Sequence, residues 1–485
     1  MKKRWIAIML AGVLAASLSA CGAQQEASQG AASTQQGTSE EKGGSQGTSE
    51  GKGSQGTSEE NGGTQQGPAE AEFANAVLAE YPGEEISMSS QEFSESELYS
   101  EWWESYWPLV DASVAAQDGM DDYYTALIGE MLQDTDENSV CSPINIYIAL
   151  AMLSEMTDGN TRAQILDVLQ ADDIEELRTR VKALWEANYV ATPVLTSLLA
   201  DSIWLRDDFD YSSDTLRSLA ENYYASSFRG EMGSGELDQA LQEWTDRNTG
   251  GLLSEYTKNL RLDPSTVIAL VSAIYYKAAW FDEFQKDATD TGVFHGAQGD
   301  QDADMMHKSD LMTYYTGDGF TAIRLSLSDS GYMYFFRPDD ETSAYEVMTD
   351  GQMLDLVRKQ EAKDSFTATV NMTIPKFSIQ QKTDLLAVME KLGMTDVLSA
   401  GIADFSPLAE NGQADGLSVT QAEHAAIVDV NEDGVTGAAY TMMMVTEGAF
   451  AGEPEEVDFI LDKPFGFAVT GTDGSVLFTG IVQSL

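Results

Sequence analysis

The stretch that decides the fold is TVIALVSAIYYKAAW, which runs from Thr266 to Trp280. Its side chains are almost all apolar, β-branched or aromatic, and Lys277 is the only charge in it. Such a run predicts a strand that is buried inside a sheet. We therefore start from a sheet and ask what surrounds it.

The neighbouring segments predict a mixture of helices and strands. An apolar, helix-prone run from Asn145 to Leu153 follows Ser142-Pro143, and proline is common near a helix start. The alternating run Thr367–Ile379 predicts another strand. Phe459–Val469 and Gly474–Val482 predict a closing pair of strands around a turn at residues 472–474. The sequence thus indicates one large α+β domain over residues 118–485.

Short motifs along this domain resemble the serpins, the serine protease inhibitor family. They follow the order of the family: Asn138–Ile146, Ala273–Trp280, Pro375–Phe377, Leu392–Met394, Ala403–Ser406, Val430–Gly434 and Lys463–Phe465. The chain departs from the family pattern at Asn145, Ser272 and Gly466, which affects local packing rather than the fold. The resemblance implies mixed β-sheets, surrounding helices and an exposed reactive loop. It also implies an inhibitor rather than an enzyme, with no catalytic residue, no metal and no cofactor.

The reactive loop should lie within residues 432–458, a stretch with no strong core pattern. At a period of two, Val435, Gly437, Ala439 and Thr441 share one uncharged side, which begins with small residues. The segment can therefore sit exposed and can also become a strand with one buried face. In serpins the cleaved loop inserts into the main sheet, so the resemblance assigns hinge roles to Glu432, Gly434, Val435, Gly437, Ala438, Ala439 and Thr441.

The family pattern places the reactive-site bond between Gly448 and Ala449, although it could lie as late as Phe450–Ala451. The residues around this bond include no Arg or Lys, which disfavours trypsin-like targets. Small or aromatic residues suit elastase-like, subtilisin-like, chymotrypsin-like or papain-like proteases. We expect a monomer that acts as a suicide inhibitor of a serine or cysteine endopeptidase.

Three further residues carry a structural expectation. The family places a histidine in a hydrogen-bonded cluster under its main sheet, which implies this role for His424, with Ser142 and Asn145 as partners. A catalytic role for His424 would need a nucleophile motif such as Gly-X-Ser-X-Gly, and the chain has none. Residues 429–434 match the first half of a calcium loop, but the twelfth position is Tyr440 instead of the required glutamate.

The charge balance excludes one class of partner. The 485 residues contain 27 Lys plus Arg and 80 Asp plus Glu, which gives a formal net charge of −53. Nucleic-acid binding needs a basic surface, so we exclude it. Two cysteines and three histidines also leave little scope for a disulfide framework or a His-rich metal site.

The amino terminus predicts export and lipid anchoring. Residues 1–20 combine a basic start with a short apolar run, as in a signal peptide. The sequence Leu-Ser-Ala-Cys ending at Cys21 resembles the bacterial lipobox, which implies lipidation of Cys21. Residues 21–68 are rich in Gly, Ser, Gln, Thr and Glu and predict a disordered tether. We expect the protein at the outer face of a bacterial membrane or at the cell surface, with membrane contact only through the lipid.

Residues 69–117 form an acidic extension that is rich in aromatic residues. It could dock a partner, but aromatic residues at this density favour a helix that packs on the main domain. The alternative function is a non-inhibitory binding module with the serpin fold, or a surface lipoprotein of another kind.

Overall fold

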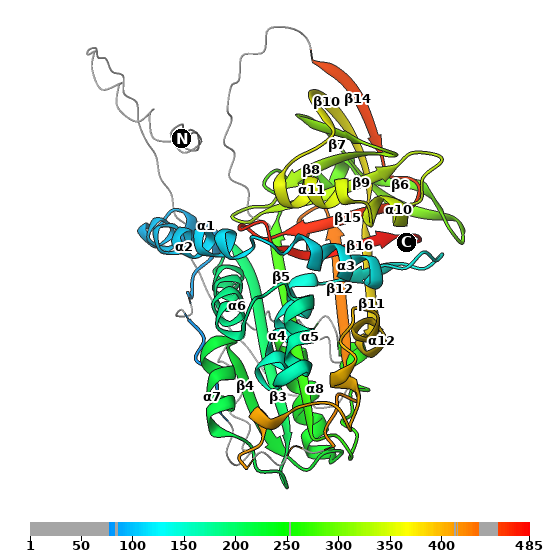
Figure 1. Ribbon diagram of the computed structural model, residues 1–485. Coiled ribbons are helices and arrows are strands. Elements are labelled where there is room, and N and C mark those ends of the chain that lie inside the picture. The colour runs from blue at the N-terminus through cyan, green and yellow to red at the C-terminus, as the bar shows by residue number, and fades with distance from the viewer. Residues whose placement is uncertain (1–76, 83–85, 252–253, 412–413, 415, 436–453) are drawn as a thin grey trace, which may run out of the picture. The chain divides into compact units, whose positions relative to one another are not determined.

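The computed structural model describes residues 77–82, 86–251, 254–411, 414, 416–435 and 454–485 (Figure 1). The longer helices begin with α2 (Glu97–Ala116), α3 (Asp121–Met131), α4 (Pro143–Glu155), α5 (Gly159–Val168) and α6 (Ile174–Asn188). They continue with α7 (Ser213–Asn222), α8 (Gly235–Asn248), α11 (Gly351–Lys359) and α12 (Leu385–Lys391). Short helices are α1 (Ser90–Ser94), α9 (Ser254–Thr257) and α10 (Ala344–Met348).

The strands form two sheets. The seven-stranded sheet contains β2 (Val190–Ala191), β3 (Leu195–Arg206), β4 (Ala225–Gly230), β5 (Ile268–Ala279), β11 (Phe377–Asp384), β12 (Glu423–Asn431) and β13 (Gly434–Val435). The nine-stranded sheet contains β1 (Ser139–Cys141), β6 (Asp290–Gly296), β7 (Gly299–Gly317), β8 (Phe320–Ser326), β9 (Tyr332–Pro338), β10 (Asp364–Pro375), β14 (Glu455–Ile460), β15 (Phe465–Thr470) and β16 (Val476–Val482).

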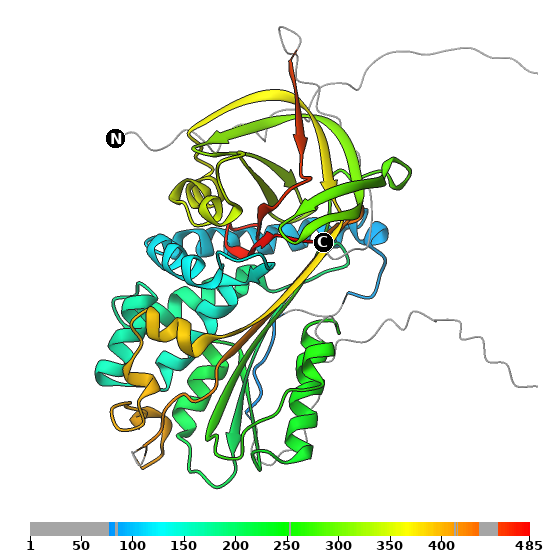
Figure 2. The ribbon, with the colours of Figure 1, turned by 90° about the vertical axis from the view of Figure 1, so that its right-hand side faces the viewer.

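The predicted central strand is β5, and the predicted helix is α4. Every residue of α4 except Ala149 is buried, which explains why the helix is apolar on all sides. α4 to α7 cover one face of the seven-stranded sheet, and α8 covers the other (Figures 1 and 2). The α+β architecture expected from the sequence is confirmed.

Two predicted strands are wrong in their extent. The run Thr367–Ile379 is two strands, β10 and β11, which belong to different sheets. The chain crosses between the sheets at Lys376, directly after Pro375. The predicted strand Phe459–Val469 is also two strands, because the chain leaves β14 after Ile460 and enters β15 only after Pro464. A proline has no amide hydrogen to donate to a sheet, so strands tend to end near it.

The extension packs on the rest of the domain, which is the favoured interpretation of its aromatic residues. α2 lies against α6, and the Tyr106 hydroxyl donates to the Ala187 carbonyl at 2.7 Å. Near the other end of α2, Ser113 and Gln117 donate to the buried carboxylate of Asp473. Helix α2 is therefore an integral part of the fold.

Residues 77–82 add a short contact at the edge of the seven-stranded sheet. Val77 pairs with Ser227 of β4, and the Ala79 amide donates to the Ser226 hydroxyl at 3.1 Å. Tyr81 stacks on Trp185, with ring centroids 5.6 Å apart. This segment is therefore held against the sheet from Val77 onwards.

Candidate functional site

The candidate site is the start of the predicted hinge, where β12 turns into β13. β13 lies between β12 and β5, because Val435 pairs with Val430 on one side and with Ala278 on the other. Val435 is 1 % exposed and belongs to the main core. The hinge was expected to be exposed, but its first strand residues are already part of the sheet.

Gly434 is required at this turn. Its φ of +152° is a conformation that other residues rarely adopt, and a Cβ there would lie 2.3 Å from the Ala278 carbonyl oxygen. The hinge enters the sheet only because its backbone can approach β5 this closely.

Below these two residues, β5 and β12 each have an edge that pairs with no other strand among the described residues. β5 pairs with β3 from Ile268 to Ala278, but its other edge pairs only with β13. β12 pairs with β11 along its whole length, and its other edge also pairs only with β13. Residues 268–272 of β5 are all partly exposed, whereas residues 201–205 of β3 are all buried. Within the described residues, β12 and β5 are therefore joined only through β13.

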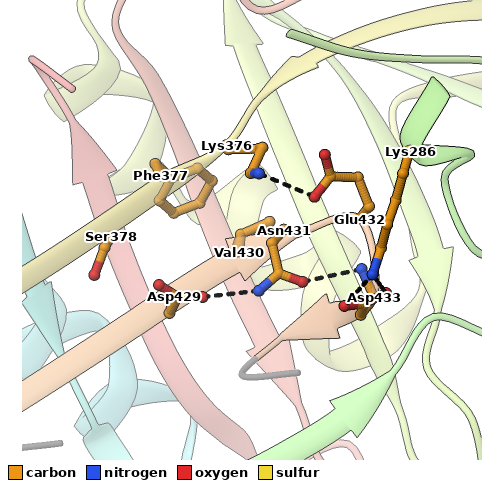
Figure 3. A pocket seen from close by; sticks show the side chains of 9 residues that line it. All are labelled: Lys286, Lys376, Phe377, Ser378, Asp429, Val430, Asn431, Glu432 and Asp433. Carbon is orange, nitrogen blue, oxygen red and sulfur yellow. Dashed lines mark hydrogen bonds and ion pairs between the residues drawn. The ribbon is translucent and has the colours of Figure 1, made fainter. Parts of the chain in front are cut away.

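Glu432 is held just before the turn. Its carboxylate forms an ion pair with Lys376 Nζ at 3.1 Å (Figure 3). It also accepts a hydrogen bond from the Thr289 hydroxyl at 2.9 Å. Burial raises the pKa of Glu432, but hydrogen bonds from the backbone, Lys376 and Thr289 outweigh burial and lower it overall. The hinge is thus anchored by a charged carboxylate.

Asp433 makes a second, more exposed anchor. Lys286 Nζ lies 2.8 Å from one carboxylate oxygen of Asp433 and 2.9 Å from the other. The Asp433 amide donates to Asn431 Oδ1, and Asn431 Nδ2 donates to Asp429 (Figure 3). The residues of the half calcium motif are thus engaged with one another and with Lys286. Within the described ranges, no cluster of three or more metal-ligating side chains is found.

The two anchors line an open pocket of about 560 Å³. Its walls come from the loop before β6, the start of β11 and the end of β12: Lys286, Lys376, Phe377, Ser378, Asp429, Val430, Asn431, Glu432 and Asp433 (Figure 3). The ion pairs thus lie at the wall of an open pocket, whereas Val435 next to them is buried in the core.

His424 is a buried residue of β12 in the same sheet. Its Nε2 accepts a hydrogen bond from the Ser142 backbone amide at 3.0 Å, so the contact does not use the Ser142 hydroxyl. Burial lowers the pKa of His424 to about 4, which keeps the ring neutral at physiological pH. Asn145 is also buried, but its Oδ1 has no hydrogen-bond partner in the described part of the chain.

Other predicted residues lie outside the described residues. They are Gly437, Ala438, Ala439, Thr441, Gly448, Ala449 and Cys21. The sequence had also given no role to Lys376, Thr289 or Lys286. The Pro-Lys-Phe motif could have drawn attention to Lys376, whereas nothing in the sequence links Thr289 or Lys286 to the hinge, since those contacts are long-range.

The comparisons with known proteins agree on one family. The family profile described as Serpin (serine protease inhibitor) matches residues 119–485. The chain is 29 % identical over 368 residues to leukocyte elastase inhibitor of Equus caballus, covering 72 % of this chain and 94 % of that protein. It is 26 % identical over 397 residues to plasminogen activator inhibitor 1 of Mus musculus, covering 78 % and 94 %.

Solved structures show the same fold. The crystal structure of the thermophilic serpin Tengpin in the native state superposes with a TM-score of 0.67 at 22 % identity, covering 84 % of this chain and 98 % of that one. The native stressed conformation of Arabidopsis AtSerpin1 gives a TM-score of 0.64 at 22 % identity, covering 78 % and 98 %. None of the helices within the described ranges is both long and apolar enough to span a membrane.

Proposed function

We infer the function from one premise, which is that this chain belongs to the serpin family of serine protease inhibitors. The family consists of protease inhibitors rather than enzymes. We propose that the chain is a suicide inhibitor of a serine or cysteine endopeptidase. The observation that supports this most is β13, which lies between β12 and β5, two strands whose facing edges pair with no other strand in the described part of the chain.

The proposed reaction begins with attack of the protease nucleophile on the carbonyl carbon of Gly448. The peptide bond to Ala449 breaks, the new amine leaves with the carboxyl-terminal fragment, and an acyl-enzyme remains. The freed arm then extends β13 between β12 and β5 and carries the protease with it. A strand from Glu432 to Gly448 would be about 55 Å long at roughly 3.3 Å per residue.

The register of β13 predicts which loop residues would face the core. If it continues unchanged, Gly437 comes between Val428 and Tyr276, both of which are buried on the helix-covered face. Thr441 comes between His424 and Ser272 by the same count. Small or hydroxyl side chains suit these positions, whereas Ala438 and Tyr440 would face away from this core.

A panel of proteases tests whether the chain is a suicide inhibitor. A soluble Cys21→Ser variant of the full chain is mixed with elastase-like, subtilisin-like, chymotrypsin-like and papain-like proteases and run on denaturing gels. We expect a covalent complex with at least one of them and a cut at Gly448–Ala449. Cleavage by every active protease without any complex would refute inhibition and favour the non-inhibitory binding module.

We propose further that the protein acts at a cell surface through a lipid on Cys21. The signal-like residues 1–20 and the lipobox-like sequence before Cys21 support this. Metabolic labelling with a fatty acid should label the wild-type chain and leave a Cys21→Ala variant unlabelled. Equal labelling of both chains would exclude Cys21 as the lipid site.

A further inference from the structure

Asp201 places a carboxyl group inside the apolar core of the seven-stranded sheet. It lies in the middle of β3, opposite Ser272 of β5 and Ala225 of β4. The residues two positions away on the same face, Leu199 and Ile203, belong to the main core. Asp201 itself is 0 % exposed. The sheet therefore holds an ionisable group away from water.

The polar atoms around this carboxyl group do not satisfy it. Neither oxygen of Asp201 has a hydrogen-bond partner among the described residues, and the same is true of Ser272 Oγ and Trp185 Nε1. Burial raises the pKa of Asp201 to about 7, and the nearby Ser272 and Trp185 lower it only in part. An ionised carboxylate in such a place is costly, because Ser272 and Trp185 replace only part of the hydration that it has lost and no charged group faces it.

The other titratable groups nearby do not supply a compensating charge. Tyr81 comes from the segment at the sheet edge, and Tyr189 follows α6. Burial raises the pKa of both phenols, so both are neutral at physiological pH. His424 lies on the same face and in the same row, on β12, and is neutral there as well. No charged group is among the described neighbours that shift Asp201.

We propose that Asp201 is a proton-linked switch that makes the resting sheet more stable in mildly acidic than in mildly alkaline solution. The uncharged side chain fits the core, whereas the ionised one strains the contacts among β3, β5 and α6. The native state binds the Asp201 proton more tightly than the unfolded chain does. The contribution to stability is therefore complete below the ordinary aspartate pKa, falls as pH rises towards about 7, and is lost above it. This inference does not depend on whether the chain inhibits a protease.

The test compares the wild type with Asp201→Asn, which keeps the shape and removes the charge. Thermal unfolding of the full chain is measured at about pH 5 and about pH 9. We expect the Tm of the wild type to fall by several degrees more than that of the variant. At the higher pH the variant should be the more stable protein. Equal pH dependence of the two proteins would overturn the proposal.

A matched control and a direct measurement complete the test. Asp238 is also buried but has partners, because its carboxylate accepts the Leu262 amide at 2.9 Å. Asp238→Asn should therefore lower the Tm at both pH values instead of raising it at the higher one. If Asp201→Asn does not fold, infrared spectra of the wild type still test whether a buried carboxyl group is protonated in acid. The band of a buried protonated carboxyl group must be present in acid and disappear as pH rises through about 7, and its absence in acid would overturn the proposal.

Discussion

Gly437 and Ala438 are adjacent in the sequence but would face opposite sides of the inserted strand. Gly437→Glu would place a charge between Val428 and Tyr276, where burial of an unpaired carboxylate costs several kcal/mol. Insertion should slow by about 100-fold or more. The acyl-enzyme would then be hydrolysed before the loop inserts, and the inhibitor would become a substrate. The measurement is the number of inhibitor molecules cleaved for each protease molecule trapped.

Ala438→Glu is the matched control, because the same charge would face away from the helix-covered core. It should trap protease almost as well as the wild type does. A result in which Ala438→Glu is the more harmful change would show that the register of β13 does not continue into the loop.

The two lysines that anchor the hinge should differ in their effects. Lys376→Met leaves the carboxylate of Glu432, which is 7 % exposed, without its cation, and we expect a loss of about 1–3 kcal/mol in unfolding free energy. Lys286→Met should cost less, since Lys286 is well exposed and its ion pair with Asp433 is screened by solvent. Chemical denaturation of both variants at neutral pH measures the difference.

Acid provides a second check on the same anchor. The pKa of Glu432 is lowered in the native state, so its contribution is present above the ordinary glutamate pKa and is lost as pH falls through the lowered value. The stability gap between wild type and Lys376→Met should therefore shrink in acid. A gap that stays constant down to strongly acidic pH would mean that Lys376 acts through packing alone.

At the scale of elements, the sequence predicted a strand well where its apolar run is continuous, although residues 268–272 of β5 are less buried than expected. Thr266–Trp280 was placed almost to the residue, because a continuous apolar run has few other solutions. The boundary between β10 and β11 was missed, because side-chain alternation continues through Pro375 while the chain changes sheets. The position of β13 between β12 and β5 also could not be predicted, since it depends on pairing between distant segments.

Helix α2 offers a prediction about the extension. Ser113 is buried and donates to the Asp473 carboxylate, which also accepts from Asn188 and Ser475. Ser113→Ala should cost about 1–3 kcal/mol, because it removes one donor from a buried charge. Ser105→Ala on the same helix is the control, since Ser105 is exposed and donates only to the Trp102 carbonyl. Equal unfolding free energies for the two variants would mean that the contact of α2 with Asp473 adds no stability.

For the whole molecule, the edges of β5 and β12 that pair only with β13 within the described ranges predict a large gain in stability after cleavage. A strand inserted between them would complete the backbone hydrogen bonds of both neighbours and cover the partly exposed residues of β5. Cutting the loop near Gly448 should therefore raise the Tm sharply. Scanning calorimetry before and after limited proteolysis measures this, and an unchanged Tm would show that the loop does not insert.

The contact of Val77 with β4 has a mechanical consequence for an anchored molecule. Val77 pairs with Ser227, which lies level with Ile203 and Leu270, near the end of the sheet farthest from the hinge. Under the proposed mechanism, insertion would carry the captured protease towards the end of the sheet where Val77 lies. The proposed tether, residues 21–68, must then leave room for a protease at least about 30 Å across. A flexible coil of the length of residues 21–68 spans about 40 Å, so shortening it should obstruct capture on a membrane while leaving capture in solution intact.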